Sequence, residues 1–339
     1  MKSLFDRPSR WLSIPAFLLI IGFLGWGYYS QSASVTESER TVFMMDTVVQ
    51  IRAVGPQAEA AVDEAVKEMQ RVERMFSRFD EDSAVDRINR AAGTWISVPE
   101  EVIALIAKGV EYGHLTEGAF DITIGALMDL WGFNTESPSM PSQDELHTAL
   151  QTLLFSEVEL NYMTNQVRIP SESVLDLGGI AKGYAVDRGR RVLQTRGVTH
   201  SIINAGGDIA TIGGRPDGRP WRVGIQDPTD SASLLAVVEI TDMTIVTSGD
   251  YERFFELDGV RFHHILDTKT GFPAEGLRSV TVIAPDAAAG DALSTAIFVL
   301  GWEKGQELVQ QLDDVEALLV NAEGENWVSL GLIDSVTFR

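Results

Sequence analysis

Apolar and polar residues alternate along the chain in two rhythms, one typical of strands and one typical of helices. Residues 47–53 alternate at every second position, which predicts a strand, whereas residues 58–76 repeat apolar side chains at helical spacing. Further helices are expected after Pro99 and at 127–131, 181–195 and 292–300, and further strands at 201–204, 221–225, 235–240, 244–246 and 279–283. No segment repeats at a fixed period, so the pattern predicts a single large mixed α+β domain.

The N-terminal residues follow a different pattern. Residues 11–29 carry no charge, and three basic residues precede them, Lys2, Arg7 and Arg10. An apolar run of about 20 residues is long enough to cross a bilayer, and basic residues favour the cytoplasmic side. We therefore expect a cytoplasmic basic N-terminus at 1–10, a transmembrane signal-anchor at 11–29, a linker at 30–41 and an exported domain at 42–339. A cleaved secretory signal is the alternative, because residues 30–34 are small or polar.

Charge and composition exclude several classes of protein. The chain has 27 Lys and Arg against 49 Asp and Glu, a formal net charge of −22, which would repel a phosphate-covered surface such as DNA. It has no cysteine, which excludes disulfides, thiolate zinc sites, iron–sulfur clusters and a thiol nucleophile. No nucleic-acid partner is expected.

The most informative segment is residues 175–183, Leu-Asp-Leu-Gly-Gly-Ile-Ala-Lys-Gly, where a strand-like run breaks at two glycines and enters a helix. Adjacent glycines let the backbone approach a phosphate or a metal, and Lys182 supplies positive charge for an anion. Gly183 follows Lys182 where a P-loop would need Ser or Thr, so the segment is not a P-loop. An ordinary strand-to-helix turn is the alternative interpretation.

Asp291 and Thr295 are four residues apart and would share one face of a helix. A carboxylate and a hydroxyl, completed by backbone carbonyls, phosphate oxygens and water, are the hard oxygen ligands that Mg²⁺ prefers. The alternative is structural, with Asp291 capping the helix and Thr295 bonding to a backbone carbonyl.

Other segments offer polar groups for a ligand. Asp208 follows a second twin-glycine turn, and Phe120 stands next to Asp121 in a loop, where an aromatic ring and a carboxylate could both contact a planar ligand. His263 and His264 would face opposite sides of an extended segment, so at most one of them readily joins a common site. A neutral imidazole there could accept a hydroxyl proton. Each of these segments also has a structural interpretation.

In their order, the segments resemble the FAD:protein FMN transferases of the ApbE family. The resemblance covers residues 42–332 and implies a T-fold-like ApbE domain. It rests on the following segments: Met45-Asp-Thr47, Gly118-Ala-Phe-Asp-Ile-Thr123, Leu175 to Gly183, Asn204-Ala-Gly-Gly-Asp208, Thr247-Ser-Gly249, His264-Ile-Leu-Asp267 with Thr270-Gly271, and Asp291-Ala-Leu-Ser-Thr295.

The resemblance also implies roles for individual residues. The carbonyl of Gly179, with Asp291 and Thr295, would bind Mg²⁺. Contacts with FAD are implied for Met45, Ala119, Phe120, Asp121, Asp176, Lys182, Asp208, His264 and Ile265. His264 stands at the position of the family's histidine, so His264 and Asp291 are the candidate catalytic residues. The chain departs from the family in three ways: Asp46 stands where Gly is frequent, Thr268 where Pro is frequent, and a lipid-bearing cysteine is missing.

The resemblance implies a function at the bacterial inner membrane, with the catalytic domain facing the periplasm. Family members use Mg²⁺ to transfer FMN from FAD to a Thr or Ser hydroxyl of a partner protein, typically a subunit of a membrane redox complex, and release AMP. Three alternatives stay open. The same site could serve a FAD pyrophosphatase that forms FMN and AMP, or a non-catalytic module for flavin binding or trafficking. The third alternative is a purely structural envelope protein.

Overall fold

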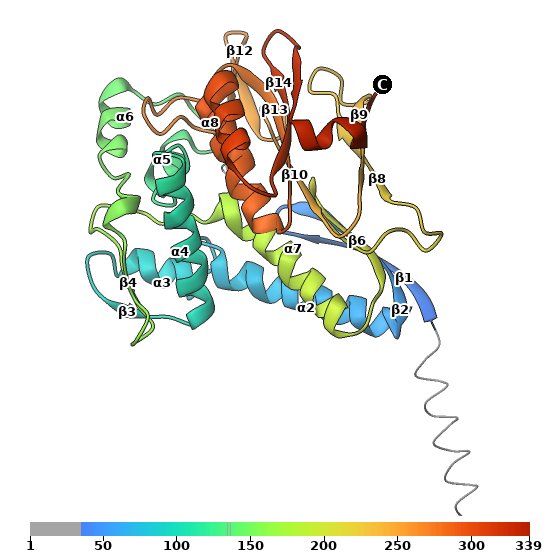
Figure 1. Cartoon of the computed structure of the whole chain (residues 1–339). Coiled ribbons are helices and arrows are strands. Elements are labelled where there is room, and N and C mark those ends of the chain that lie inside the picture. The colour runs from blue at the N-terminus through green and yellow to red at the C-terminus, as the bar shows by residue number, and fades with distance from the viewer. Residues whose placement is uncertain (1–34, 134, 136) are drawn as a thin grey trace, which may run out of the picture.

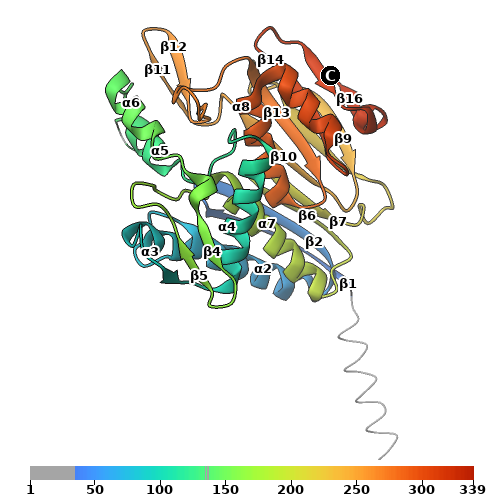
Figure 2. The ribbon, with the colours of Figure 1, turned by 60° about the vertical axis from the view of Figure 1, so that its left-hand side comes forward.

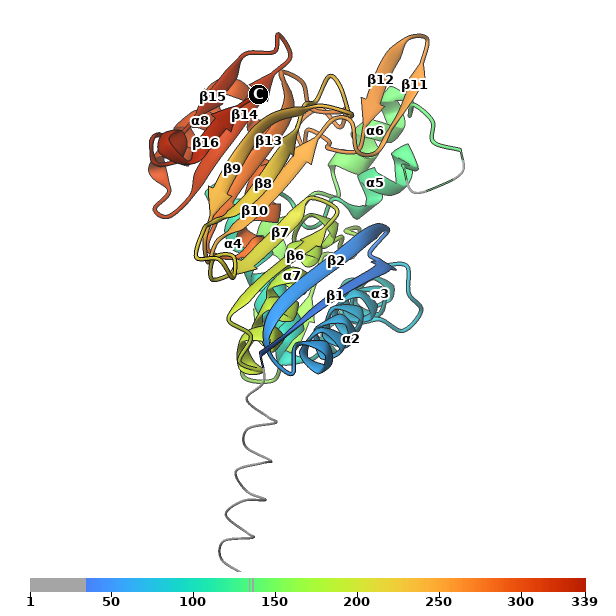
Figure 3. The same cartoon turned by 90° about the vertical axis from the view of Figure 1, so that its right-hand side faces the viewer.

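A large antiparallel sheet forms the centre of the molecule (Figure 3). The structure is a computed structural model, and it describes residues 35–133, 135 and 137–339. In spatial order the strands are β1 (Val35–Met44), β2 (Thr47–Pro56), β6 (His200–Ala205), β7 (Asp208–Ile212), β10 (Thr244–Gly249), β13 (Leu277–Ala284), β14 (Glu316–Asn321) and β15 (Asn326–Val328).

Three long helices cover one face of this sheet (Figure 1). They are α2 (Ala58–Phe76), α7 (Gly178–Thr195) and α8 (Ala287–Gln311). The apolar residues of α2 recur at helical spacing, so one stripe of the helix, including Ala61, Ala65 and Met69, is buried against the sheet. α8 packs on β13 and β14 and has an internal break at Gly301, where φ is 80°. The helices and the sheet together enclose the main core.

A second, smaller sheet covers part of the opposite face of the central sheet, as Figure 3 shows. Its strands lie in the order β16 (Val336–Phe338), β9 (Leu234–Ile240) and β8 (Trp221–Gln226). Alternate residues of β8, including Val223 and Ile225, are buried against Ile245 of β10 and Leu318 of β14. Because strands present alternate residues to opposite faces, β10 and β14 contribute to the cores on both sides.

The remaining elements surround the sheet and its three long helices. They are α3 (Ala84–Arg90), β3 (Ile96–Ser97), α4 (Glu100–Leu115), α5 (Gly125–Trp131), α6 (Gln143–Leu150), η1 (Phe155–Glu157), β4 (Glu159–Asn161), β5 (Gln166–Arg168), β11 (Phe254–Leu257), β12 (Val260–His263) and η2 (Leu330–Ser335). α4 lies near α7 at the centre of the view in Figure 2. α5, α6 and the β11–β12 hairpin share an apolar cluster around the buried Trp131, whose indole N–H donates to the carbonyl of Gly271 at 2.8 Å.

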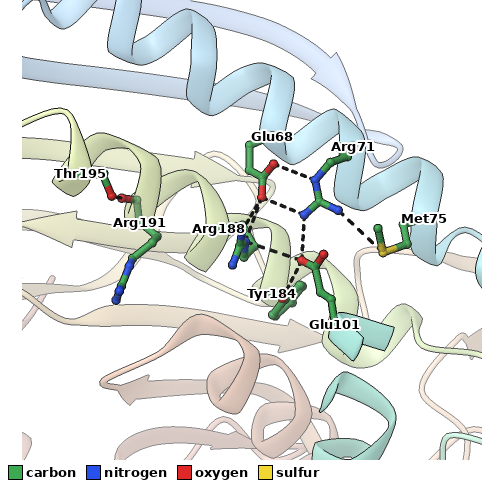
Figure 4. Close-up of polar contacts among 8 residues, drawn as sticks. All are labelled: Glu68, Arg71, Met75, Glu101, Tyr184, Arg188, Arg191 and Thr195. Carbon is green, nitrogen blue, oxygen red and sulfur yellow. Dashed lines mark hydrogen bonds and ion pairs between the residues drawn. The ribbon is translucent and has the colours of Figure 1, made fainter. Parts of the chain in front are cut away.

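Charged side chains join α2, α4 and α7 (Figure 4). Arg71 of α2 pairs with Glu68 at 2.8 Å and with Glu101 of α4 at 2.8 Å. Arg188 of α7 donates to Glu68 at 2.9 Å, and the Tyr184 hydroxyl donates to Glu101 at 2.7 Å. The network therefore fixes α2 relative to α7.

The structure confirms a single domain that mixes helices with a sheet. The expected linker at 30–41 needs correction, because residues 35–41 belong to β1 and pair with β2. β1 is an edge strand that is mostly exposed or half-buried, so it needs no apolar alternation and looked like a linker in sequence. The expected transmembrane segment at 11–29 lies outside the described residues. No helix in the part of the chain that the structure describes is long and apolar enough to span a bilayer.

Candidate active site

A pocket of about 280 Å³ lies where the start of α7, the first turns of α8 and the β1–β2 turn meet. Its wall includes every residue that the resemblance implies for the site except Asp208: Met45, Ala119, Phe120, Asp121, Asp176, Gly179, Lys182, His264, Ile265, Asp291 and Thr295. Segments that lie up to about 250 residues apart in the sequence therefore share one cavity.

The crossing of α7 and α8 at Gly183 positions Asp291. A Cβ atom on Gly183 would lie 2.2 Å from the carbonyl oxygen of Ala287, so only glycine permits this approach. The Gly183 N–H donates to Asp291 Oδ2 at 3.0 Å. In a regular α-helix this N–H would point at the carbonyl of Gly179, four residues earlier. Asp291 competes for that amide, which favours a further partner for the Gly179 carbonyl.

Gly179 also lies next to Thr295. A Cβ atom on Gly179 would lie 3.8 Å from Thr295 Oγ1 and 3.1 Å from Cε2 of Phe120. Thr295 follows Asp291 by one turn of α8, so both side chains are on the same face of that helix. The structure thus brings together the carbonyl, carboxylate and hydroxyl that are the expected Mg²⁺ ligands.

Lys182 pairs with Asp208. Its Nζ lies 3.0 Å from Asp208 Oδ1, and Asp208 is completely buried on β7. Burial raises the pKa of Asp208, although the charge of Lys182 acts to lower it. Burial acts to lower the pKa of Lys182, but the nearby carboxylates of Asp208, Asp291 and Glu252 raise it overall. Asp208 contacts Lys182 but is not among the residues that line the pocket, and its implied contact with FAD stays a prediction.

The β1–β2 turn carries Met45 and Asp46 into the pocket. Both residues have positive φ, 52° and 56°, because a two-residue hairpin loop of this hand requires it. The Met45 N–H donates to Glu73 Oε1 of α2 at 2.5 Å, which holds the turn against the helix. The positive φ of Asp46 explains why glycine suits this position.

Two carboxylates of the wall are held by neighbouring groups. Asp121 accepts hydrogen bonds from the Thr123 N–H and hydroxyl, both at 2.6 Å, and burial raises the pKa of Asp121. Asp176 accepts from the Gly178 N–H at 2.8 Å and forms an ion pair with Nε of Arg78 at 2.8 Å. Their orientation is fixed before any ligand binds.

The two histidines have different environments. His263 is buried, its Nε2 lies 3.0 Å from the carbonyl oxygen of Ala274, and its ring packs edge-on against Phe298. His264 is half-buried in the pocket wall, and its Nδ1 lies 3.3 Å from the Arg253 carbonyl oxygen. Because a carbonyl only accepts, Nδ1 carries the proton and Nε2 is the basic nitrogen. Burial lowers the pKa of His264 to about 3, so the ring is neutral at physiological pH.

Comparison with known proteins identifies the family. The sequence model of the ApbE family matches residues 45–319. The chain belongs to the ApbE family. It is 33% identical to the FAD:protein FMN transferase of Treponema pallidum, with 94% of each chain covered. It is also 33% identical to the FAD:protein FMN transferase of Escherichia coli K12, with 91% of this chain and 92% of that protein covered.

Solved structures agree with this assignment. The ApbE protein of Thermotoga maritima superposes with a TM-score of 0.84 at 35% identity, covering 88% of this chain and 99% of that chain. The flavinyl transferase ApbE of Pseudomonas stutzeri gives a TM-score of 0.79 at 30% identity, covering 89% and 97%. These matches confirm the resemblance that was drawn from the sequence and the expected enzyme class, a transferase.

Several residues of the ApbE pocket had no signal in the sequence, among them Arg78, Phe79, Glu252 and Arg253. Arg78 lies over the ring of Phe79, with its guanidinium carbon 4.4 Å from the ring centre, and Phe79 is 65% exposed. Glu252 and Arg253 lie between β10 and β11, beyond the Thr-Ser-Gly segment at 247–249. In the sequence, only the neighbouring segment at 247–249 could have indicated Glu252 and Arg253.

The residues at the helix crossing fit the Mg²⁺ ion that the ApbE resemblance implies. Asp291 is 6% exposed, and burial raises its pKa, a cost that a cation at its carboxylate would offset. Within the described residues, no cluster of three or more His, Asp or Glu side chains forms a preformed metal site. A set of one carboxylate, one hydroxyl and one carbonyl suits an ion that takes its other ligands from phosphate and water.

Proposed function

We propose that this chain transfers FMN from FAD to the hydroxyl of a Thr or Ser of a partner protein, releasing AMP, with Mg²⁺ as cofactor. One observation carries the proposal: Gly179, Asp291, Thr295 and Lys182 lie in a single pocket. The names of the ApbE relatives support the same reaction.

The charges of the pocket explain the need for a cation. Its described wall has six acidic residues, Asp46, Glu73, Asp121, Asp176, Glu252 and Asp291, and three basic residues, Arg78, Lys182 and Arg253. FAD carries a doubly negative diphosphate, which this acidic excess would repel. A bound Mg²⁺ would neutralise the diphosphate and make its phosphorus more susceptible to attack.

The residues of the chain can orient the other reactants. Lys182 is directed by Asp208 and can contact a phosphate oxygen, while Phe120 and Phe79 provide aromatic surfaces for a flavin ring. The acceptor oxygen forms a bond to the phosphorus of the FMN half as the bond from that phosphorus to the bridging oxygen of AMP breaks. Nε2 of His264 would accept the hydroxyl proton, since Nδ1 faces the Arg253 carbonyl. AMP leaves with the bridging oxygen.

The proposed location is the inner membrane, with the domain in the periplasm. Residues 30–34 separate the apolar run at 11–29 from the start of β1 at Val35. An acceptor on a membrane redox complex would then lie within reach of the pocket. An alkaline phosphatase fusion to the C-terminus of the full chain should be active, and an inactive fusion in a stably produced protein would contradict this orientation.

Mass spectrometry tests the reaction. The full-length chain, in detergent, is incubated with FAD, Mg²⁺ and purified membrane redox subunits from the same organism. A subunit that gains the mass of one FMN phosphoester supports the proposal. FMN and AMP released without labelled protein would identify a pyrophosphatase, and unchanged FAD would identify a binding module.

A matched pair of variants tests the site. Asp291→Asn keeps the size of the side chain but removes the charge, and it should lower transfer at least 100-fold while the fold is kept. The control is Asp313→Asn, the same change at an exposed aspartate beyond the end of α8, and it should transfer normally. A fully active Asp291→Asn protein would remove the metal assignment.

A further inference from the structure

A second hollow adjoins the active-site pocket. It has a volume of about 380 Å³ and is formed by residues 267–269 and the region of α8 around its break at Gly301. Val299, Leu300 and Trp302 give it apolar surface, and it also carries two acidic and two basic side chains, Asp267, Glu303, Lys269 and Lys304. Its size is in the range of sites that bind ligands or peptide side chains. None of the steps described above uses this hollow.

Three chain segments run from the pocket directly into the hollow. Ala119 lines both cavities. Ile265 and Leu266 line the pocket, and the next three residues, 267–269, line the hollow. On α8, Thr295 lines the pocket and Val299, four residues later, lines the hollow, a rise of about 6 Å along the helix. The hollow therefore lies next to the active-site pocket and shares part of its wall.

The walls of the hollow are held in place. The Thr268 hydroxyl donates to the Gly118 carbonyl at 2.7 Å, which ties the loop to the segment that carries Ala119. Asp267 accepts from the Lys269 N–H at 2.8 Å, and its own N–H donates to the Phe272 carbonyl at 2.8 Å. A preformed compartment binds a partner segment without a large ordering cost.

We propose that this hollow binds the part of the acceptor polypeptide that flanks the modified Thr or Ser. The inference rests on the proposed FMN transfer. The acceptor oxygen must approach the phosphorus to about 3–3.5 Å, next to the Asp291 and Thr295 face. Thr295 and Val299 are about 6 Å apart along the axis of α8, and an extended chain at about 3.3–3.6 Å per residue covers that length with about two residues.

The geometry of an extended chain determines which side chain of the acceptor reaches the hollow. Residues i and i+2 of an extended chain point to the same side. While the hydroxyl faces the phosphorus, the side chain two residues away enters the hollow, where Val299, Leu300 and Trp302 offer apolar contacts. The charged side chains of the same wall offer polar contacts, so a side chain with an apolar stem and a polar end fits best. FAD itself is a less suitable occupant. Among the residues that the resemblance implies for FAD, only Ala119 borders the hollow.

Two variants and one control test the inference. Val299→Phe fills the hollow, and Leu300→Ala removes part of its apolar wall; both positions are half-buried. Val192→Phe makes the same change as the first variant at a half-buried helical valine of α7 that lines neither cavity. The acceptor is a subunit that the wild-type chain has been shown by mass spectrometry to label. A synthetic peptide of about ten residues centred on its modified residue is the second probe.

Both hollow variants should raise the KM for subunit and peptide about tenfold, with the dissociation constant for FAD, measured by flavin fluorescence with Mg²⁺, unchanged within twofold. The control should match wild type in both. An unchanged acceptor KM in the folded variants overturns the inference alone. Weakened FAD binding overturns it too, because the hollow would then hold part of FAD. If the wild-type chain labels no subunit, the proposed function fails, and this inference fails with it.

Discussion

The substitution Gly183→Ala tests the central geometric idea, that the contact of α7 with α8 builds the cation site. The added Cβ atom would lie 2.2 Å from the carbonyl oxygen of Ala287, 2.5 Å from its carbonyl carbon and 2.8 Å from the nitrogen of Ala288. All three are backbone atoms, so no side-chain rotation relieves the clash. Ordinary contact begins at 3.4 Å, and the helices must therefore separate by about 1.2 Å, the difference from 2.2 Å.

The size of the effect follows from two opposing contributions. Overpacking of a core costs about 1–3 kcal/mol. Alanine regains about 0.5–1 kcal/mol over glycine inside a helix. A net loss of about 1–2 kcal/mol in the free energy of unfolding is expected. The effect on Mg²⁺ should be larger, because that ion needs its oxygen ligands at about 2.0–2.1 Å and tolerates little distortion. A displacement near 1 Å between Gly179 and Asp291 should therefore raise the Mg²⁺ concentration for half-maximal transfer more than tenfold.

Urea unfolding and transfer rates over a range of Mg²⁺ concentrations measure both effects. Gly189→Ala is the matched control, because Gly189 lies on the same helix but its added Cβ would meet the flexible side chain of Met69, at 2.8 Å from the sulfur. That variant should keep the Mg²⁺ dependence of the wild type. Wild-type stability together with wild-type Mg²⁺ dependence in Gly183→Ala would refute the reasoning.

Three further predictions follow from the charges of the molecule. Burial lowers the pKa of His264 to about 3, so the transfer rate should show no inflection near pH 6.5 from this residue. An inflection there that disappears in His264→Ala would contradict its assignment as a neutral base. Hydrogen bonds from Arg71, then from Arg188, lower the pKa of Glu68 to about 2, against a cost of burial, so its stabilisation is present above pH 4.5 and is lost as the pH falls toward 2. Because solvent screens these ion pairs, Glu68→Gln should unfold with about 1 kcal/mol less free energy at pH 7 and resemble wild type near pH 2 in urea titrations. A loss independent of pH would exclude this origin. Removal of divalent cations with EDTA should abolish transfer and weaken FAD binding, and added Mg²⁺ should restore both. FAD binding that is insensitive to EDTA would show that no cation is needed to offset the repulsion between the acidic wall and the diphosphate.

The helices of the site could be predicted from the sequence, but their ends could not. The helix expected at 181–195 begins at Gly178, because the crossing with α8 tolerates glycines whose helix propensity is low. The helix expected at 292–300 runs from Ala287 to Gln311, beyond the break at Gly301. In both cases tertiary packing extends the helix past the limits that local propensity sets.

The polar residues of the pocket also fall into two groups, those that the sequence indicates and those that it does not. Lys182, Asp291 and Thr295 stand in segments whose glycines and spacing indicate a site, and the structure brings them together. The complete burial of Asp208 depends on β7 lying between β6 and β10, a pairing that no local pattern reports. Arg78 joins the pocket only because it packs against Asp176, a residue distant in sequence. Side chains whose role comes from long-range pairing have no local signal.

Because Lys182 is paired with Asp208, it attracts an anion in the pocket less strongly than a free charge would. At 3.0 Å from a carboxylate that has no solvent contact, the ammonium of Lys182 forms a nearly neutral pair, and its remaining field toward the pocket is that of a dipole. A dipole orients an anion but attracts it far less than a free charge at the same distance. Arg78 is engaged in the same way by Asp129 and Asp176. Both of these cations are therefore suited to fixing the position of a diphosphate. Under the proposed function, an ion held by Gly179, Asp291 and Thr295 would add the attraction that overcomes the acidic wall.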